Sequence, residues 1–311
     1  MDGFAGHNAG GLYRVIYGDP AAPSAGDAAT EAPVPYDMSS TSLGGVIGSN
    51  GGAVGSANFS LERLAVLPCA RQMTVSPSSR LLFVSTLKEF CAHSPSIGET
   101  DLDKGAIWAV ELSPSTGRVQ RKAMLVQQLL DPQGIDYANG TLYIATSGRG
   151  KKSEGRGNCV LRIPDVDALA MSVLADPAAS LPFDDARVED VNCSFTTIQP
   201  AGHSRGHAWR SLRVEPSGKR AYVQVGSDCN WQADCVPSDV NAHTNFLAFD
   251  VVEGSETFGG VMVVGNGIRN AVGMWFDRNG NLLWIDNGSD DEEVRRLNRS
   301  DNPPRLIATF R

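Results

Sequence analysis

The chain has 311 residues, of which 41% are hydrophobic and 20% charged, and its formal net charge is −8 at pH 7. This length allows one large domain or two medium ones with a substantial core, whereas the excess of acidic residues argues against nucleic acid or an anionic membrane surface as partner. No apolar stretch approaches the ~20 residues of a membrane helix, so we expect no membrane span.

The first 58 residues are expected to differ from the rest of the chain. Residues 11–17 form one strand-like piece, and residues 19–58 are rich in Gly, Ala, Ser and Pro, which is typical of a linker or disordered segment. The N-terminus has neither a basic n-region nor an apolar h-region, so we expect no signal peptide in these residues. We therefore divide the chain into an N-terminal piece, residues 1–58, and a folded region, residues 59–311.

From residue 59 onward one pattern recurs: an apolar strand, a turn of Pro, Ser, Asn or Gly, and a second apolar strand. β-Branched and aromatic residues flank each turn with a period near two. The hairpins that this pattern predicts span residues 70–86, 132–147, 209–227 and 269–289. Further strands are expected at residues 106–112, 160–163, 245–251 and 260–264, and helical stretches at residues 125–130 and 166–175.

The spacing of the hairpins predicts the architecture. The unit recurs at intervals of roughly 60 to 75 residues with about four strands each, and radial repetition of four-stranded sheets is a β-propeller. We therefore expect an all-β fold, a β-propeller with about four blades in this chain. A β-sandwich with similar turns is the alternative.

Two of the five histidines lie directly before the third hairpin, in residues 202–210, GHSRGHAWR. The innermost strand of a propeller blade lines the channel, so His207 can point into the channel mouth, where an imidazole with a pKa near ~6.5 suits a general base. Asp228 ends the same hairpin, and its carboxylate could orient the imidazole. A hydrogen-bonded structural histidine and an ordinary turn aspartate are the plain alternatives.

The fourth hairpin carries candidates for binding an anion and a metal. Arg269 and Asn270 stand where it begins, the position equivalent to His207, and a guanidinium suits a carboxylate while an amide supplies both a donor and an acceptor. The loop at residues 286–293, DNGSDDEE, offers the hard oxygen ligands that suit Ca²⁺. A salt bridge with a turn asparagine, followed by an exposed acidic loop, is the alternative.

The cysteines and sequons bear on the compartment. Six cysteines are too few for a disulfide scaffold at this length, and no CxxC pair indicates zinc or redox chemistry. Cys229 and Cys235 bracket a short loop and could form a bridge. Five N-x-Ser/Thr sequons permit a secretory route: Asn58, Asn139, Asn192, Asn287 and Asn298.

The third and fourth hairpins resemble those of a known family. GHAWRSLRVEPSGKRAYVQVGSDCN is similar to the histidine hairpin of the soluble quinoprotein glucose/sorbosone dehydrogenases, and GIRNAVGMWFD with LLWIDNGSDDE is similar to their signature hairpin. Residues 70–86 and 131–149 resemble the first two blades, so the resemblance covers roughly residues 59–311. It implies a six-bladed propeller that binds pyrroloquinoline quinone (PQQ) with Ca²⁺ and oxidises a sugar, passing electrons to an external acceptor, in an extracellular or secretory location.

The resemblance also implies a role for the histidine hairpin. His207 would be the base that takes the proton of the sugar hydroxyl. The aspartate that partners the family's base maps onto Ser227 or Asp228. The family's base is often preceded by Asp, whereas Gly206 stands there in this chain.

In the fourth hairpin the resemblance implies the cofactor contacts. Arg269 and Asn270 would contact the carboxylates and quinone oxygens of PQQ. The backbone carbonyls of Gly288 and Ser289 would hold the Ca²⁺ that polarises the quinone.

The chain departs from the family in its extent. It ends at Arg311 within an expected strand, so about two blades and their cationic residues are expected to be missing, with edge strands left exposed. Residues 10–17 are similar to the last strand of the family's propellers, which suggests a piece of a longer product. A Ca²⁺-dependent lactonase or esterase propeller, and a non-catalytic binding propeller or inactive fragment, are the alternative functions.

Overall fold

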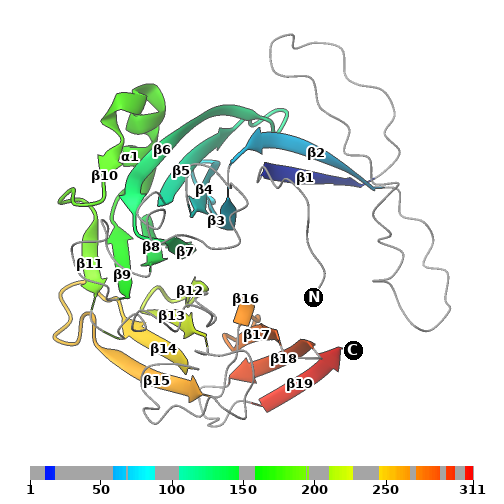
Figure 1. Cartoon of the computed structure of the whole chain (residues 1–311), viewed down its shortest axis with the longest axis vertical. Helices are drawn as coiled ribbons and strands as arrows, with labels where there is room; N and C mark the ends of the chain where they lie inside the picture. The colour runs from blue at the N-terminus through cyan, green and yellow to red at the C-terminus, as the bar shows by residue number, and fades with distance from the viewer. Residues whose placement is uncertain are drawn as a thin grey trace, which may run out of the picture. The chain divides into compact units, whose positions relative to one another are not determined.

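A computed structural model of the whole chain describes residues 11–17, 59–67, 69–87, 105–146, 158–193, 195, 210–226, 245–266, 271–287, 292–297 and 305–310. The chain divides into two compact units, Met1–Pro68 and Cys69–Arg311. The predicted linker lies outside the described residues, so the domain boundary at residue 58 stays a prediction. Figure 1 labels the helices and strands.

The first unit contains a two-stranded antiparallel sheet. Strand β1 (Gly11–Tyr17) pairs with β2 (Phe59–Val66), with Gly11 opposite Val66 and Tyr17 opposite Phe59. The register shifts once, between Leu12 and Tyr13. The strand predicted at residues 11–17 is confirmed.

The second unit contains four sheets. The first has the order β10-β6-β5-β4-β3, with bounds Leu181–Pro182, Val119–Leu129, Gly105–Leu112, Leu81–Thr86 and Ala70–Ser76. The second has the order β11-β9-β8-β7, with bounds Glu189–Asn192, Cys159–Ile163, Thr141–Thr146 and Pro132–Ala138. All pairings are antiparallel except that of the short β10 with β6.

The third and fourth sheets are antiparallel meanders in chain order (Figure 1). The third comprises β12 (Leu212–Val214), β13 (Arg220–Val225), β14 (Asn245–Asp250) and β15 (Val261–Asn266). The fourth comprises β16 (Ala271–Phe276), β17 (Leu282–Asn287), β18 (Glu292–Leu297) and β19 (Arg305–Phe310).

In each sheet, the strand that comes first in the chain contacts the first strand of a neighbouring sheet. Strand β3 contacts β7, β7 contacts β12, and β12 contacts β16, so the first strands of the four sheets follow one another side by side. Four-stranded meanders that meet through their first strands are blades of a β-propeller. The predicted all-β propeller is therefore confirmed, and so are its four hairpins.

Apolar side chains fill the space between successive sheets. One buried cluster joins the first two sheets, a second joins the second and third, and a third joins the third and fourth. Phe83, Phe249 and Trp284 are fully buried members of the three clusters. Burial of each such side chain contributes about 1.5–3 kcal/mol, so the blades are held together chiefly by their facing surfaces.

The two helical predictions had different outcomes. Helix α1 spans Val166–Ala175, as expected, and buries Val166, Ala170, Val173 and Leu174 against the first two sheets. The helix expected at residues 125–130 is wrong, because residues 125–129 form the end of β6, which pairs with β5. A stretch as short as LVQQLL does not by itself distinguish a buried strand from a helix.

The turn between β7 and β8 follows directly from its sequence. Asn139 and Gly140 both have positive φ, 50° and 80°. Two positive φ values in succession define the type I′ turn, whose twist matches that of a hairpin and which favours Asn-Gly.

Among the described residues, no helix has the length and hydrophobicity needed to cross a membrane.

Candidate functional site

The first strands of the four sheets, β3, β7, β12 and β16, are the inner strands, and all four begin on the same side of the sheets. Hydrogen bonds join the starts of these strands: Gln72 Nε2 donates to the carbonyl of Leu212, and Ser211 Oγ donates to the carbonyl of Ala271. The middles of β3 and β7 are joined by Thr74 Oγ1, which donates to Asp136. Inner strands so aligned run in one direction. We call the side where β3, β7, β12 and β16 begin the start side.

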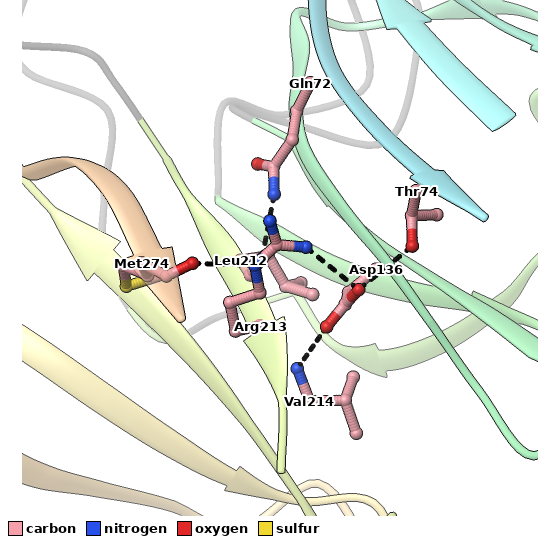
Figure 2. Close-up of polar contacts among 7 residues, drawn as sticks. All are labelled: Gln72, Thr74, Asp136, Leu212, Arg213, Val214 and Met274. Atoms are coloured by element: carbon pink, nitrogen blue, oxygen red, sulfur yellow. Dashed lines mark hydrogen bonds and ion pairs between the residues drawn. The ribbon is translucent and has the colours of Figure 1, made fainter. Parts of the chain in front are cut away.

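One polar network crosses all four inner strands below the start side (Figure 2). The carboxylate of Asp136 on β7 accepts hydrogen bonds from Thr74 Oγ1 at 3.1 Å, Arg213 Nη1 at 3.0 Å and the backbone N–H of Val214 at 2.8 Å. Arg213 Nε in turn donates to the carbonyl of Met274 at 2.8 Å. The network links strands of different sheets by polar contacts as well as by apolar packing.

Gln133 organises the start side itself. This buried amide donates from Nε2 to Asp131 Oδ2 at 2.7 Å, and its Oε1 accepts the backbone N–H of Arg210 at 3.1 Å. Its own carbonyl accepts a hydrogen bond from Ser85 Oγ at 2.9 Å. Gln133 therefore ties the first, second and third sheets together at the point where β7 begins.

Arg210 is the second organising residue. Its guanidinium, on a residue that is 7% exposed, donates from Nε to Oδ1 of the fully buried Asn158 at 2.8 Å. Its backbone lies directly on β7, because a Cβ on Gly134 would come within 2.1 Å of the Arg210 carbonyl oxygen and 2.6 Å of the Leu212 nitrogen. Glycine at position 134 is thus a requirement of close backbone approach.

A second guanidinium, that of Arg71, lies near the carboxylate of Asp131 at the start side. Burial lowers the pKa of Arg71, and the Coulombic attraction of Asp131 opposes this shift. The residue as a whole is exposed, so its desolvation is partial and the guanidinium stays protonated. The start side therefore combines the guanidinium groups of Arg71 and Arg210 and two amides with the carboxylate of Asp131, and the ends of β17 and β18 add Asp286, Glu292 and Glu293.

The residues predicted from the sequence to form the site lie outside the described part of the chain: His207, Asp228, Arg269, Asn270, Gly288 and Ser289. Their described neighbours are strand ends on the start side. Arg210 follows His207 by three positions, and β16 begins at Ala271, immediately after Asn270. Strand β13 ends shortly before Asp228, and β17 ends immediately before Gly288.

The sequence reasoning missed the buried residues of the start side. Asp131 and Gln133 lie at the beginning of the second hairpin, and the sequence prediction sought its candidates His207 and Arg269 at the beginnings of the third and fourth. A comparison of equivalent hairpin positions could have found them. Asn158 carries no comparable signal, because it precedes β9, and its bond to Arg210 depends on the fold.

Disulfides occur on the same side. Cys159, the first residue of β9, is bonded to Cys193, just after the end of β11, and Cys69 is also disulfide-bonded. The bridge expected between Cys229 and Cys235 lies outside the described residues. Within the described part of the chain, no group of three or more His, Cys, Asp or Glu side chains is arranged to hold a metal ion. The Ca²⁺ site therefore stays a prediction.

No protein-family model matches the sequence, and no curated protein is significantly similar to it. Solved structures are similar in fold. The holo PQQ domain of pyranose dehydrogenase from Coprinopsis cinerea aligns with a TM-score of 0.50 and 18% identity, over 78% of this chain and 53% of that one. The PQQ-bound aldose sugar dehydrogenase from Streptomyces coelicolor aligns with a TM-score of 0.44 and 16% identity, over 76% of this chain and 62% of that one.

A third similar structure is not described as a dehydrogenase. A chain of the nidogen/laminin complex aligns with a TM-score of 0.47 and 10% identity, over 81% of this chain and 72% of that one. Of these three, the pyranose dehydrogenase domain alone reaches a TM-score of 0.5. At 18% identity, this similarity shows a shared fold and nothing more. The chain spans about half the length of that domain. The class established is thus a β-propeller similar in fold to a PQQ-binding sugar dehydrogenase domain.

Proposed function

We propose that this chain is a PQQ-dependent sugar dehydrogenase propeller, or the part of one that carries the base and the cofactor contacts. The observation that carries the proposal is the hydrogen-bonded cluster of Asp131, Gln133, Asn158 and Arg210 at the start side. It organises the side of the sheets on which the predicted residues flank strand ends. The fold shared with the PQQ domain of pyranose dehydrogenase supports the same reading.

The donor set of the start side fits the chemistry of PQQ. PQQ is an anionic quinone with several carboxylates, and such a ligand needs cationic and amide donors around it. Arg71 supplies an exposed guanidinium, and the predicted Arg269 and Asn270 would add a second guanidinium and an amide. Arg210, Gln133 and Asn158 are buried and bonded to one another, so they support this site without contacting the cofactor. The carboxylate of Asp131 is engaged by Gln133. Asp286, Glu292 and Glu293 also lie on the start side, where β17 ends and β18 begins, next in the chain to the residues predicted to hold Ca²⁺.

We assign the catalytic proton to His207. Its imidazole takes the proton of the sugar hydroxyl, and Asp228 orients the ring and stabilises the imidazolium that forms. When bound, PQQ supplies a quinone that accepts a hydride equivalent from the carbon bearing that hydroxyl. His207 would hold the proton until it is released to solvent.

The remaining predicted residues bind and orient the cofactor. Arg269 and Asn270 would contact the carboxylates and quinone oxygens of PQQ. The carbonyls of Gly288 and Ser289 would contribute oxygen ligands of the kind that Ca²⁺ prefers. The electrons would pass to an external acceptor.

The disulfides support an extracellular or secretory location for this function. Cys69, Cys159 and Cys193 are all disulfide-bonded. Structural disulfides persist in oxidising compartments and are rare in the cytosol. The sequons agree with such a compartment.

The test is reconstitution with PQQ and Ca²⁺, followed by dye reduction with a panel of aldoses. We expect activity that requires both additions and falls about 10²–10⁴-fold in His207→Ala. His203→Ala, a change of the same kind four residues away, is the matched control and should retain activity. Equal activity in both variants would remove the base assignment, and lactone hydrolysis without sugar oxidation would favour the lactonase alternative.

A further inference from the structure

Two consecutive residues hold both ends of the segment that contains His203 and His207. At its N-terminal end, Cys193 is joined by a disulfide to Cys159. At its C-terminal end, Arg210 Nε donates to Asn158 Oδ1 at 2.8 Å. Residues 158 and 159 are adjacent at the start of β9, so the segment leaves and returns at one place. We call this pair of attachments the clasp.

Packing and further hydrogen bonds also hold the two ends of the segment. On the N-terminal side, the ring of Phe195 packs edge-to-face against Phe249, with 4.9 Å between ring centroids. On the C-terminal side, the backbone N–H of Arg210 donates to Gln133, and Ser211 Oγ donates to the carbonyl of Ala271. Arg210, Asn158, Gln133 and Ser211 are all buried, so these bonds are shielded from competition by water.

We propose that Asn158 and the Cys159–Cys193 disulfide are positioning elements that fix the base of this segment and thereby set the placement of His207. The catalytic part of this inference rests on the proposed function, whereas the anchoring of the segment does not. His207 lies three residues from Arg210, so freedom gained by Arg210 is passed to it through very few backbone torsions. A base misplaced by about 1 Å loses a large part of its rate contribution.

The anchoring is tested by tryptic cleavage after Arg205, which lies inside the segment, with the cut identified by mass. Asn158→Ala removes the acceptor of Arg210 Nε, and loss of this hydrogen bond should raise the cleavage rate at least about fivefold when opening is at equilibrium. Asn158→Asp retains an acceptor oxygen and should stay within about twofold of the parent. The paired change Cys159→Ser with Cys193→Ser should also raise the rate.

A matched control separates the clasp from general destabilisation. Asn281→Ala removes a hydrogen bond of the same length, 2.8 Å from Nδ2 to Asp277 Oδ2, in the turn at the other end of the fourth sheet. It should leave cleavage after Arg205 unchanged. If Asn158→Ala does not fold, Arg210→Met removes the same bond from the other partner and gives the same test.

The activity of the reconstituted protein then tests the catalytic part. We expect Asn158→Ala to lower kcat while PQQ affinity, measured by titration, is retained, and Asn158→Asp to restore kcat. Unchanged cleavage after Arg205 in both Asn158→Ala and the paired serine variant would overturn the clasp. Faster cleavage, combined with sugar oxidation that does not depend on His207, would support the anchoring and overturn the role given to it in catalysis.

Discussion

Asp136 on β7 and Arg213 on β12 form an ion pair between neighbouring sheets, with 3.0 Å between Oδ1 and Nη1. Their side chains are 13% and 29% exposed, so water competes weakly for either group. The same carboxylate accepts hydrogen bonds from Thr74 and from the backbone of Val214. One aspartate of the second sheet thus satisfies donors from the first and third sheets.

We expect Asp136→Ala to destabilise the protein by about 2–4 kcal/mol, because it leaves a half-buried guanidinium and a backbone N–H without their acceptor. Asp136→Asn retains one carbonyl acceptor and should cost less. Urea unfolding of the two variants measures the difference in free energy of unfolding. Equal stability of the alanine variant and the parent would show that water replaces the carboxylate without cost.

Gly134→Ala should destabilise the junction of β7 and β12. The added Cβ would lie 2.1 Å from the Arg210 carbonyl oxygen, so the backbone must move, at a cost of about 1–3 kcal/mol. Gly273 is the third residue of β16, as Gly134 is the third residue of β7, and a Cβ there meets nothing within 4 Å. Gly273→Ala is therefore the matched control, and thermal unfolding should show it to be neutral or slightly stabilising.

The sequence predicts the hairpins well because the residues of each turn themselves favour the turn conformation. Asn139-Gly140 requires a hairpin turn, and the alternating residues on either side set which face is buried. The repeat then determines the propeller, since equivalent hairpins pack in equivalent ways. The same logic placed the functional candidates at the start of the inner strands.

The start-side cluster could not be predicted in the same way. Asn158 and Arg210 are far apart in the sequence, and their contact exists because β9 and β12 belong to adjacent sheets that pack together. The Cys159–Cys193 pairing likewise depends on β9 lying beside β11, and a count of six cysteines does not reveal it. Contacts across the fold carry no local pattern.

Removal of the Cys159–Cys193 disulfide should lower stability substantially. The bridge has a sequence separation of 34 residues, and closing a loop of that length restricts the unfolded chain by about 3–4 kcal/mol in the chain-entropy description. Denaturant unfolding of the paired serine variant measures the loss. A reductant should bring the parent toward the variant, and a loss well below about 2 kcal/mol would mean that the unfolded chain retains structure in this region.

The last prediction concerns acid stability and the ion pair of Asp185 with Arg187. Hydrogen bonds from the Arg187 side chain and then from its backbone lower the pKa of Asp185 to about 2. Because the folded pKa lies below the unfolded value of ~3.9, the contribution of Asp185 to stability is present above that value and is lost as the pH falls toward 2.

The contribution should be small, because the Arg187 side chain is 58% exposed and solvent screens the pair. Asp185→Asn should therefore change the free energy of unfolding slightly at pH 6 and less at pH 2, where the folded carboxyl is about half protonated, as measured by urea titration at both values. Asp184→Asn, at the exposed neighbouring position, is the control. A loss in Asp185→Asn that is as large at pH 2 as at pH 6 would show that the residue acts through packing of the turn, because protonation would have removed most of the ionic part.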